Sequence, residues 1–126
     1  MMIKLLLLMI FAHIADDFYL QGNLAKMKQK VWWEKLFEYK SIYKHDYKMA
    51  LLIHSMSWSI MILIPAMILL PTVSSYLLLG AFVFNAIIHY WTDNEKCNKL
   101  RINLIVDQTV HLIQVFVTWI LLCQMW

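Results

Sequence analysis

Residues 49–92, MALLIHSMSWSIMILIPAMILLPTVSSYLLLGAFVFNAIIHYWT, contain no Asp, Glu, Lys or Arg. A helix needs about 20 mostly apolar residues, with a range of about 17 to 25, to cross the hydrocarbon core of a bilayer. This stretch is long enough for two such helices, 49–70 and 73–92, and Pro71 with the following Thr and Ser residues favours a turn between them. It therefore predicts a helical hairpin that crosses a membrane twice.

Two further apolar runs, residues 2–20 and 102–126, flank this hairpin. Lys4 ahead of the first run also suits a signal peptide, but His13 would occupy the minus-three position of the cleavage site, so we interpret the run as a span. Of the 126 residues, 62% are hydrophobic and only 15% are charged, which argues against an ordinary soluble domain. The sequence predicts a single all-α domain over residues 1–126, with four transmembrane helices in an antiparallel bundle.

Basic residues are concentrated in two connections between the predicted spans. Seven of the eleven Lys and Arg lie in residues 26–48, and three lie in residues 96–101. The positive-inside rule places these connections in the cytoplasm and both termini outside, in the cytoplasmic (inner) membrane. Segment 23–48 also interleaves Trp and Tyr with Lys, which predicts one or two short interfacial helices, with a solvated loop as the alternative. Its lysines directly abut apolar runs, so the lipid bilayer is the expected partner and nucleic acid is not.

Histidine and aspartate recur inside the predicted spans at one spacing. In the first, third and fourth spans a His and an Asp are four residues apart, which puts both side chains on one helical face. His54 lies six residues after Lys48, the last charged residue before the second span. At a rise of about 1.5 Å per residue this places His54 about 9 Å inside the membrane, and the Asp and His residues of the other spans lie at a similar depth. The candidate ligands are His13, Asp17, His54, His89, Asp93, Asp107 and His111.

Several buried carboxylates need a compensating charge, because each one costs at least about 2.5 to 3.5 kcal/mol inside a bilayer. Imidazole with carboxylate suits zinc, iron or manganese, so we expect one or two divalent ions. Gln21 and Gln108 are expected to orient the ligands, and Lys96 either contacts an anionic substrate or extends to the membrane surface. Metal-free alternatives remain, namely a proton or ion relay and structural hydrogen-bonded pairs.

Four motifs follow one another along nearly the whole chain: H-x3-D-x3-Q from His13, His54 alone, H-x3-D-x2-K from His89, and D-Q-x2-H from Asp107. This order resembles the small bacterial and phage-encoded integral membrane proteins grouped as domain of unknown function family 3307. Asp16 and the long first connection depart from that pattern. The resemblance implies no activity, since that family has none assigned, and likeness to membrane-bound metal-dependent hydrolases is an analogy only.

The predicted site allows several functions. If the protein is an enzyme, metal-activated water attacking a membrane-delivered ester, such as a lipid headgroup, is the most economical reaction. The alternatives are a protein that relays or transports protons or metal ions, and a non-catalytic membrane partner with a structural metal site. A relay would need polar groups continuing outward, for which we identified only Thr72, Thr118 and the pair Ser74 and Ser75. A chain this short is also a candidate for homo-oligomerisation.

Overall fold

The computed structural model describes residues 1–36 and 41–124, and every regular element in these ranges is helical. The all-α prediction is therefore confirmed for the described residues. Four short elements lie between the first and second long helices: a π-helical turn, two short α-helices and one turn of 3-10 helix. In chain order the elements are α1 (Met2–Ile14), the π turn (Ala15–Leu20), α2 (Leu24–Met27), α3 (Lys30–Leu36), the 3-10 turn (Ser41–Tyr43), α4 (Asp46–Leu69), α5 (Ser75–Cys97) and α6 (Leu104–Gln124).

Three helices, α4, α5 and α6, are long and apolar enough to cross a membrane. They cover most of the predicted spans 49–70, 73–92 and 102–126. The first predicted span, 2–20, differs, because its regular α-helix has only 13 residues and then widens into the π turn. A fourth crossing by this segment stays a prediction.

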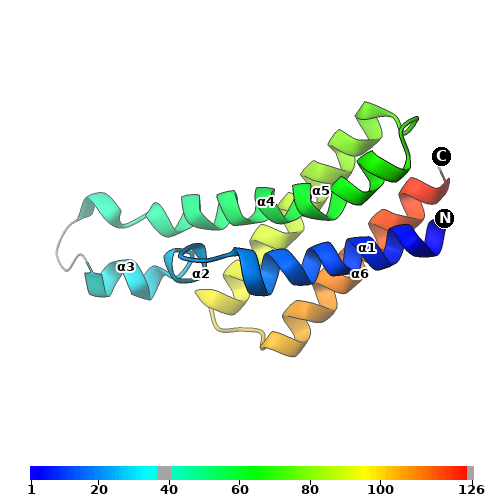
Figure 1. Cartoon of the computed structure of the whole chain (residues 1–126). Helices are drawn as coiled ribbons and strands as arrows, with labels where there is room; N and C mark the ends of the chain where they lie inside the picture. Colours follow the sequence, from blue (N-terminus) through cyan, green and yellow to red (C-terminus); the bar gives the residue numbers. More distant parts are fainter. Residues whose placement is uncertain (37–40, 125–126) are drawn as a thin grey trace.

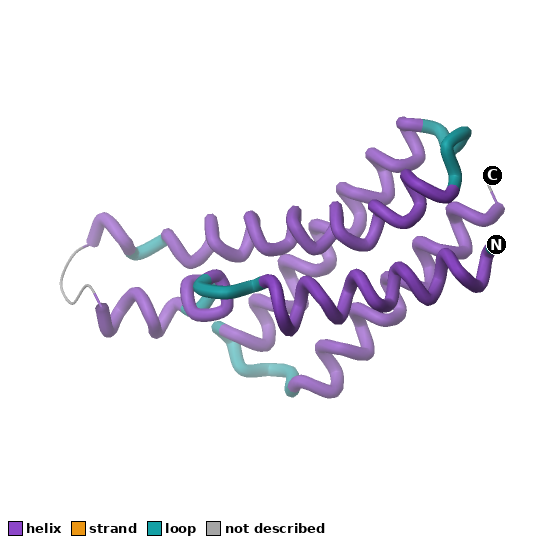
Figure 2. The backbone as a smooth tube through the Cα atoms, in the orientation of Figure 1, coloured by secondary structure: helices purple, strands orange, loops and turns teal. Residues whose placement is uncertain are grey.

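The four long helices pack around one another. Helix α1 contacts α4 and α6, and α5 contacts the same two helices. Figure 1 shows both termini at the end of the molecule that holds the turn between α4 and α5, while α2 and α3 lie at the opposite end. The tube in Figure 2 shows that short loops join α4 to α5 and α5 to α6. This arrangement directs the polar residues of all four helices toward a shared interior.

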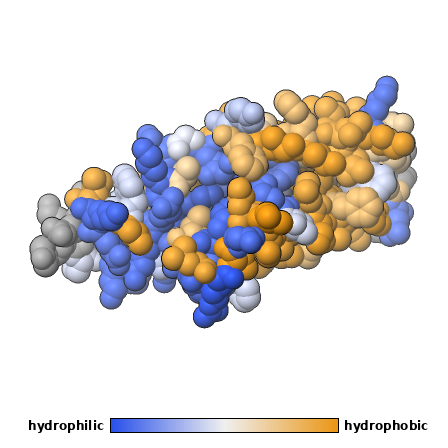
Figure 3. All heavy atoms as spheres, turned by 90° about the horizontal axis from the view of Figure 1, so that it is seen from below, coloured by the Kyte–Doolittle hydropathy of each residue, from blue (hydrophilic) through white to orange (hydrophobic). Residues whose placement is uncertain are grey.

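The apolar core occupies the half of the molecule nearer the termini. Leu5 and Met9 are one turn apart on α1 and fully buried, as are Trp58 and Ile62 on α4. Figure 3 shows hydrophobic side chains over this half and hydrophilic ones over the half that holds α2 and α3. Large apolar residues are also exposed on the outer faces, including Phe11, which is 67% exposed. Apolar surface of this extent is typical of a membrane or protein contact.

The basic segment between α1 and α4 extends beyond the apolar half of the molecule. Helix α3 runs beside the beginning of α4 (Figure 1). The side chain of Asn98, which follows α5, donates to the Lys28 carbonyl at 3.1 Å and accepts from the Lys30 N–H at 2.7 Å. These bonds anchor the segment over one end of α5. Residues 37–40, which belong to the predicted interfacial segment, lie outside the described residues.

Candidate metal centre

Ionisable side chains from five elements meet where the polar half of the molecule joins the apolar half. Helices α1 and α4 each contribute an imidazole, the π turn contributes carboxylates, and α5 and α6 each contribute one imidazole and one carboxylate. All of these side chains are buried. The structure brings the seven predicted ligands into one connected cluster: His13, Asp17, His54, His89, Asp93, Asp107 and His111.

The first donor set lies where the π turn, α4 and α5 meet. His54 Nε2 is 3.0 Å from His89 Nε2, 3.3 Å from Asp17 Oδ1 and 3.3 Å from Asp93 Oδ2. His89 Nε2 is 3.9 Å from Asp17 Oδ1 and 3.8 Å from Asp93 Oδ2. Donors around a tetrahedral ion with bonds of about 2.1 Å are about 3.4 Å apart, which these distances approach. Asp17, His54 and His89 form a group that could hold a metal ion.

The second donor set lies between α5 and α6. His111 Nε2 is 3.6 Å from Asp93 Oδ1 and 3.4 Å from Asp107 Oδ1. These three atoms are buried, and none has a hydrogen-bond partner within the described part of the chain. His89, Asp93 and His111 form a second group that could hold a metal ion. Asp93 thus belongs to both sets, with Oδ2 in the first and Oδ1 in the second.

The unpartnered atoms of the second set indicate what kind of ligand would fit it. A buried acceptor without a partner costs about 1 to 3 kcal/mol, and more if it is charged. A divalent cation among Asp93 Oδ1, Asp107 Oδ1 and His111 Nε2 would satisfy all three at once. The donor chemistry, imidazole nitrogen with carboxylate oxygen, suits zinc, iron or manganese without selecting one of them.

The π turn explains how two consecutive aspartates face the same interior. Successive side chains on a regular α-helix point about 100° apart, so only one of two neighbours normally faces a narrow site. In the π turn the helix widens by one residue per hydrogen bond, and Asp16 and Asp17 are 3% and 9% exposed. Gly22, with φ +52, then ends this helical run. The widened turn therefore brings an additional carboxylate to the centre.

Each of two candidate ligand histidines has a polar group on its second ring nitrogen. His54 Nδ1 is 3.7 Å from Asp16 Oδ2, and Ser57 Oγ donates to the other Asp16 oxygen at 2.9 Å. His111 Nδ1 is 3.1 Å from Gln114 Oε1. An acceptor at Nδ1 favours the tautomer whose Nε2 lone pair is free for a metal. The Gln114 contact thus favours a His111 tautomer that presents Nε2 to the second donor set, whereas Asp16 Oδ2 lies within ion-pair distance of His54 Nδ1 but beyond hydrogen-bond distance.

The residues predicted to orient the ligands contact them directly. Gln108 Nε2 donates to Asp17 Oδ2 at 2.9 Å and to Asp107 Oδ2 at 3.0 Å, so it joins the two donor sets. Gln21 Nε2 donates to the Asp17 carbonyl and, at 3.2 Å, to Asp17 Oδ1. Lys96 Nζ is 2.5 Å from Asp107 Oδ2, so it points into the cluster. These contacts hold the carboxylates in place.

His13 lies at the edge of the cluster and belongs to neither donor group. Its Nδ1 accepts a hydrogen bond from Trp58 Nε1 at 2.9 Å and is 3.9 Å from Asp17 Oδ2. Trp58 is fully buried and stacks on His89 with ring centroids 4.4 Å apart. Trp58 therefore contacts two histidines of the cluster and helps to fix their positions.

Other residues of the cluster escaped the sequence interpretation. Lys28 is 4% exposed and its Nζ is 2.6 Å from Asp93 Oδ2, although the sequence placed it in a surface segment. Asn85 and Gln114 are buried, with Gln114 Nε2 donating to the Asn85 carbonyl at 3.1 Å and Asn85 Nδ2 donating to Thr118 Oγ1 at 2.8 Å. The two amide residues lie inside apolar predicted spans, and this position was the feature of the sequence that could have identified them as part of a buried polar network. Polar groups therefore continue beyond the His/Asp layer further than we predicted.

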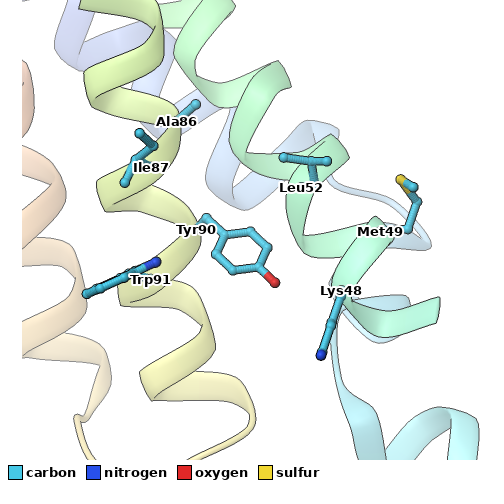
Figure 4. Close-up of a pocket in the computed structure, with 7 residues that line it drawn as sticks. All are labelled: Lys48, Met49, Leu52, Ala86, Ile87, Tyr90 and Trp91. Carbon is cyan, nitrogen blue, oxygen red and sulfur yellow. The ribbon is translucent and has the colours of Figure 1, made fainter. Parts of the chain in front are cut away.

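A separate groove lies on the outer side of α4 and α5 (Figure 4) and has a volume of about 390 Å³. Its wall is almost entirely apolar, and none of the candidate ligands lines it. Lys48 and Tyr90 carry the charged and hydroxyl groups of the wall. The lining residues are Lys48, Met49, Leu52, Ala86, Ile87, Tyr90 and Trp91.

Comparison of the chain with known protein families, curated proteins and solved structures found no match. The resemblance to domain of unknown function family 3307 therefore stays a prediction. The function must be argued from the geometry of the cluster itself.

Proposed function

We propose that the chain is an integral membrane protein of four antiparallel spanning helices, with a divalent-metal centre on the cytoplasmic side of the inner membrane. The apolar character of α4, α5 and α6 supports the membrane assignment. The basic residues gathered beside the cluster support the orientation, because such residues are enriched on the cytoplasmic side. The observation that carries the metal proposal is the presence of two buried His/Asp groups that could each hold an ion and that share His89. The two oxygens of Asp93 also connect the donor sets, one near His54 and the other near His111.

The reaction that best suits this centre is hydrolysis of an ester delivered from the membrane. A bound divalent ion supplies a nucleophilic water at neutral pH and polarises the ester oxygen. The protein holds the ligands in a buried site, and Gln108 joins the carboxylates of both sets. Asp16 belongs to neither donor set, and its Oδ2 has no hydrogen-bond partner among the described residues, so this carboxylate is available to move a proton.

Metal content tests the proposal. Protein purified in detergent is analysed by elemental mass spectrometry, together with Asp107→Asn and His89→Ala. We expect one or two equivalents of zinc, iron or manganese in the wild type, a decrease in Asp107→Asn and a loss in His89→Ala, because His89 contributes to both donor groups. The matched controls are Asp46→Asn and His45→Ala, which lie outside the cluster. Absence of metal in the wild type after reconstitution would overturn the proposal.

A proton or metal-ion relay is the second candidate function. The observation that favours it is the chain of hydrogen bonds from His111 through Gln114 and Asn85 to Thr118. This chain extends the polar interior toward the end that holds the termini. Flux into proteoliposomes tests it, with Asp107→Asn as the variant. Flux that depends on Asp107 would replace the hydrolase proposal, and absence of flux would argue against the relay.

A non-catalytic role is the third possibility, in which the metal holds a small bundle or a homo-oligomer together. The exposed apolar faces of the helices could contact a second copy of the chain or another membrane protein. A screen of lipid and phosphate-ester hydrolysis with the metal-loaded protein separates this role from the enzyme. Turnover lost in His89→Ala would support the enzyme, and full metal without turnover would support the structural role.

A further inference from the structure

Lys28 is a buried lysine in the connection between α2 and α3. It is 4% exposed, and its Nζ lies 2.6 Å from Asp93 Oδ2. Its backbone is held by the bond from Asn98 Nδ2 to the Lys28 carbonyl, at 3.1 Å. Lysine is almost never fully buried unless it is paired, so a charge placed this way belongs to the site it contacts. Lys28 is therefore a component of the centre.

Lys96 approaches the same carboxylate from α5. Its Nζ is 3.5 Å from Asp93 Oδ1 and 2.5 Å from Asp107 Oδ2. The Lys96 side chain is 22% exposed, so this side of the centre reaches the molecular surface. One ammonium group thus lies beside each oxygen of Asp93, the residue that the two donor sets share.

The formal charge of the centre depends on how many metal ions it holds. Four carboxylates and two ammonium groups leave two negative charges when the imidazoles are neutral. One divalent ion would balance these charges, and a second would leave two positive charges in a buried place, which is unfavourable. A centre with both donor sets filled therefore needs an anion. The charged groups are those of Asp16, Asp17, Asp93, Asp107, Lys28 and Lys96.

We propose that the centre with both donor sets filled binds a phosphate group through Lys28 and Lys96, so that the substrate class is a phosphate monoester. This inference rests on the proposed function. Metal ions would compete with the ammonium groups for the oxygens of Asp93 and Asp107, and lysine is a common point-charge contact for phosphate. A phosphate dianion would supply two negative charges together with acceptors for both lysines. A lipid whose headgroup is a phosphate monoester and a water-soluble phosphate monoester share this chemistry.

Titration calorimetry with inorganic phosphate tests this site. The protein in detergent is loaded with Mn²⁺ or Zn²⁺, freed of excess metal and compared with Lys28→Gln, Lys96→Gln and Lys28→Arg. Lys48→Gln is the matched control, because Lys48 lies in the outer groove and has no ion pair among the described residues. Metal content is measured for every variant, so that loss of the centre is distinguished from loss of phosphate binding.

We expect saturable phosphate binding to the loaded wild type and none to the metal-free protein. Each lysine-to-glutamine variant should keep its metal and bind phosphate about tenfold more weakly, since a charged hydrogen bond is lost. Lys28→Arg should retain most of the affinity, and Lys48→Gln all of it. A loaded wild type without phosphate binding, or wild-type affinity for phosphate in both glutamine variants, would overturn this inference alone. Absence of metal from the wild type would instead overturn the proposed function.

The source of the phosphate is resolved by competition. Glycerol phosphate and a short-chain phosphatidate are each added to the loaded protein with bound inorganic phosphate. Displacement by phosphatidate alone supports a lipid headgroup as the source, and equal displacement by both supports a water-soluble ester. Failure of both to displace the phosphate would overturn the assignment of a phosphate ester as the substrate.

Discussion

Replacement of Asp93 by Asn should strongly destabilise the metal-free protein. The Lys28 and Asp93 side chains are 5% and 0% exposed and their charged atoms are 2.6 Å apart, so the variant leaves a buried ammonium without its carboxylate. Breaking a buried ion pair on one side costs about 3 to 5 kcal/mol, or roughly 10²- to 10⁴-fold in the unfolding equilibrium constant. The double variant Asp93→Asn with Lys28→Met should recover much of this loss, because it removes the uncompensated charge.

The assay is unfolding of the metal-free protein in mixed micelles with rising SDS, followed by tryptophan fluorescence. Trp58 reports on the site, since its ring stacks on His89 at 4.4 Å. Glu95→Gln is the control, because it removes an exposed partner of Lys99 and should barely shift the midpoint. An Asp93→Asn protein as stable as the Glu95→Gln control would refute the reasoning. Failure of Lys28→Met to restore any stability would refute the assignment of the cost to Lys28.

Three further predictions concern the metal. Gln114→Leu removes the acceptor at His111 Nδ1 and should weaken metal affinity about 10- to 100-fold in a competition titration; an unchanged affinity would exclude an orienting role for Gln114. Acidification should release metal, because protons compete for the imidazole nitrogens, and full occupancy at about pH 4, below the ordinary histidine pKa of about 6.5, would contradict ligation by His54 and His111. Removal of the metal with a chelator should lower the free energy of unfolding by about 2.7 kcal/mol, if the free metal concentration before chelation was about 100 times the dissociation constant. An unchanged SDS midpoint would indicate that metal binds outside the folded centre.

The long helices were predictable because their signal is local. Residues 49–92 lack Asp, Glu, Lys and Arg, and that composition with Pro71 was enough to predict the hairpin of α4 and α5. Composition predicted only part of the structure of the first apolar run, residues 2–20. Its apolar run begins as a regular helix and changes to a π turn at Ala15, where Asp16 and Asp17 become buried and the turn contacts α4.

Much of the candidate site was also predictable, because a spacing of four residues places two side chains on one helical face. This rule identified the pairs on α5 and α6, and matching depth added His54. The rule does not specify which oxygen serves which donor set, so the sharing of Asp93 was not predictable. It also treats every His and Asp pair alike, and therefore included His13, whose Nδ1 accepts from Trp58.

The sequence by itself determined which segments are helical and apolar and which layer the ionisable residues occupy, because both follow from composition and helical periodicity. Only the tertiary structure decided that Lys28, from a basic connection, is buried against Asp93, 65 residues away along the chain. It also decided that Asn85, Gln114 and Thr118 form a hydrogen-bonded chain below His111. The physical reason is that the free energy of a buried charge or amide depends on its partner, and partners from different helices meet only after those helices have packed.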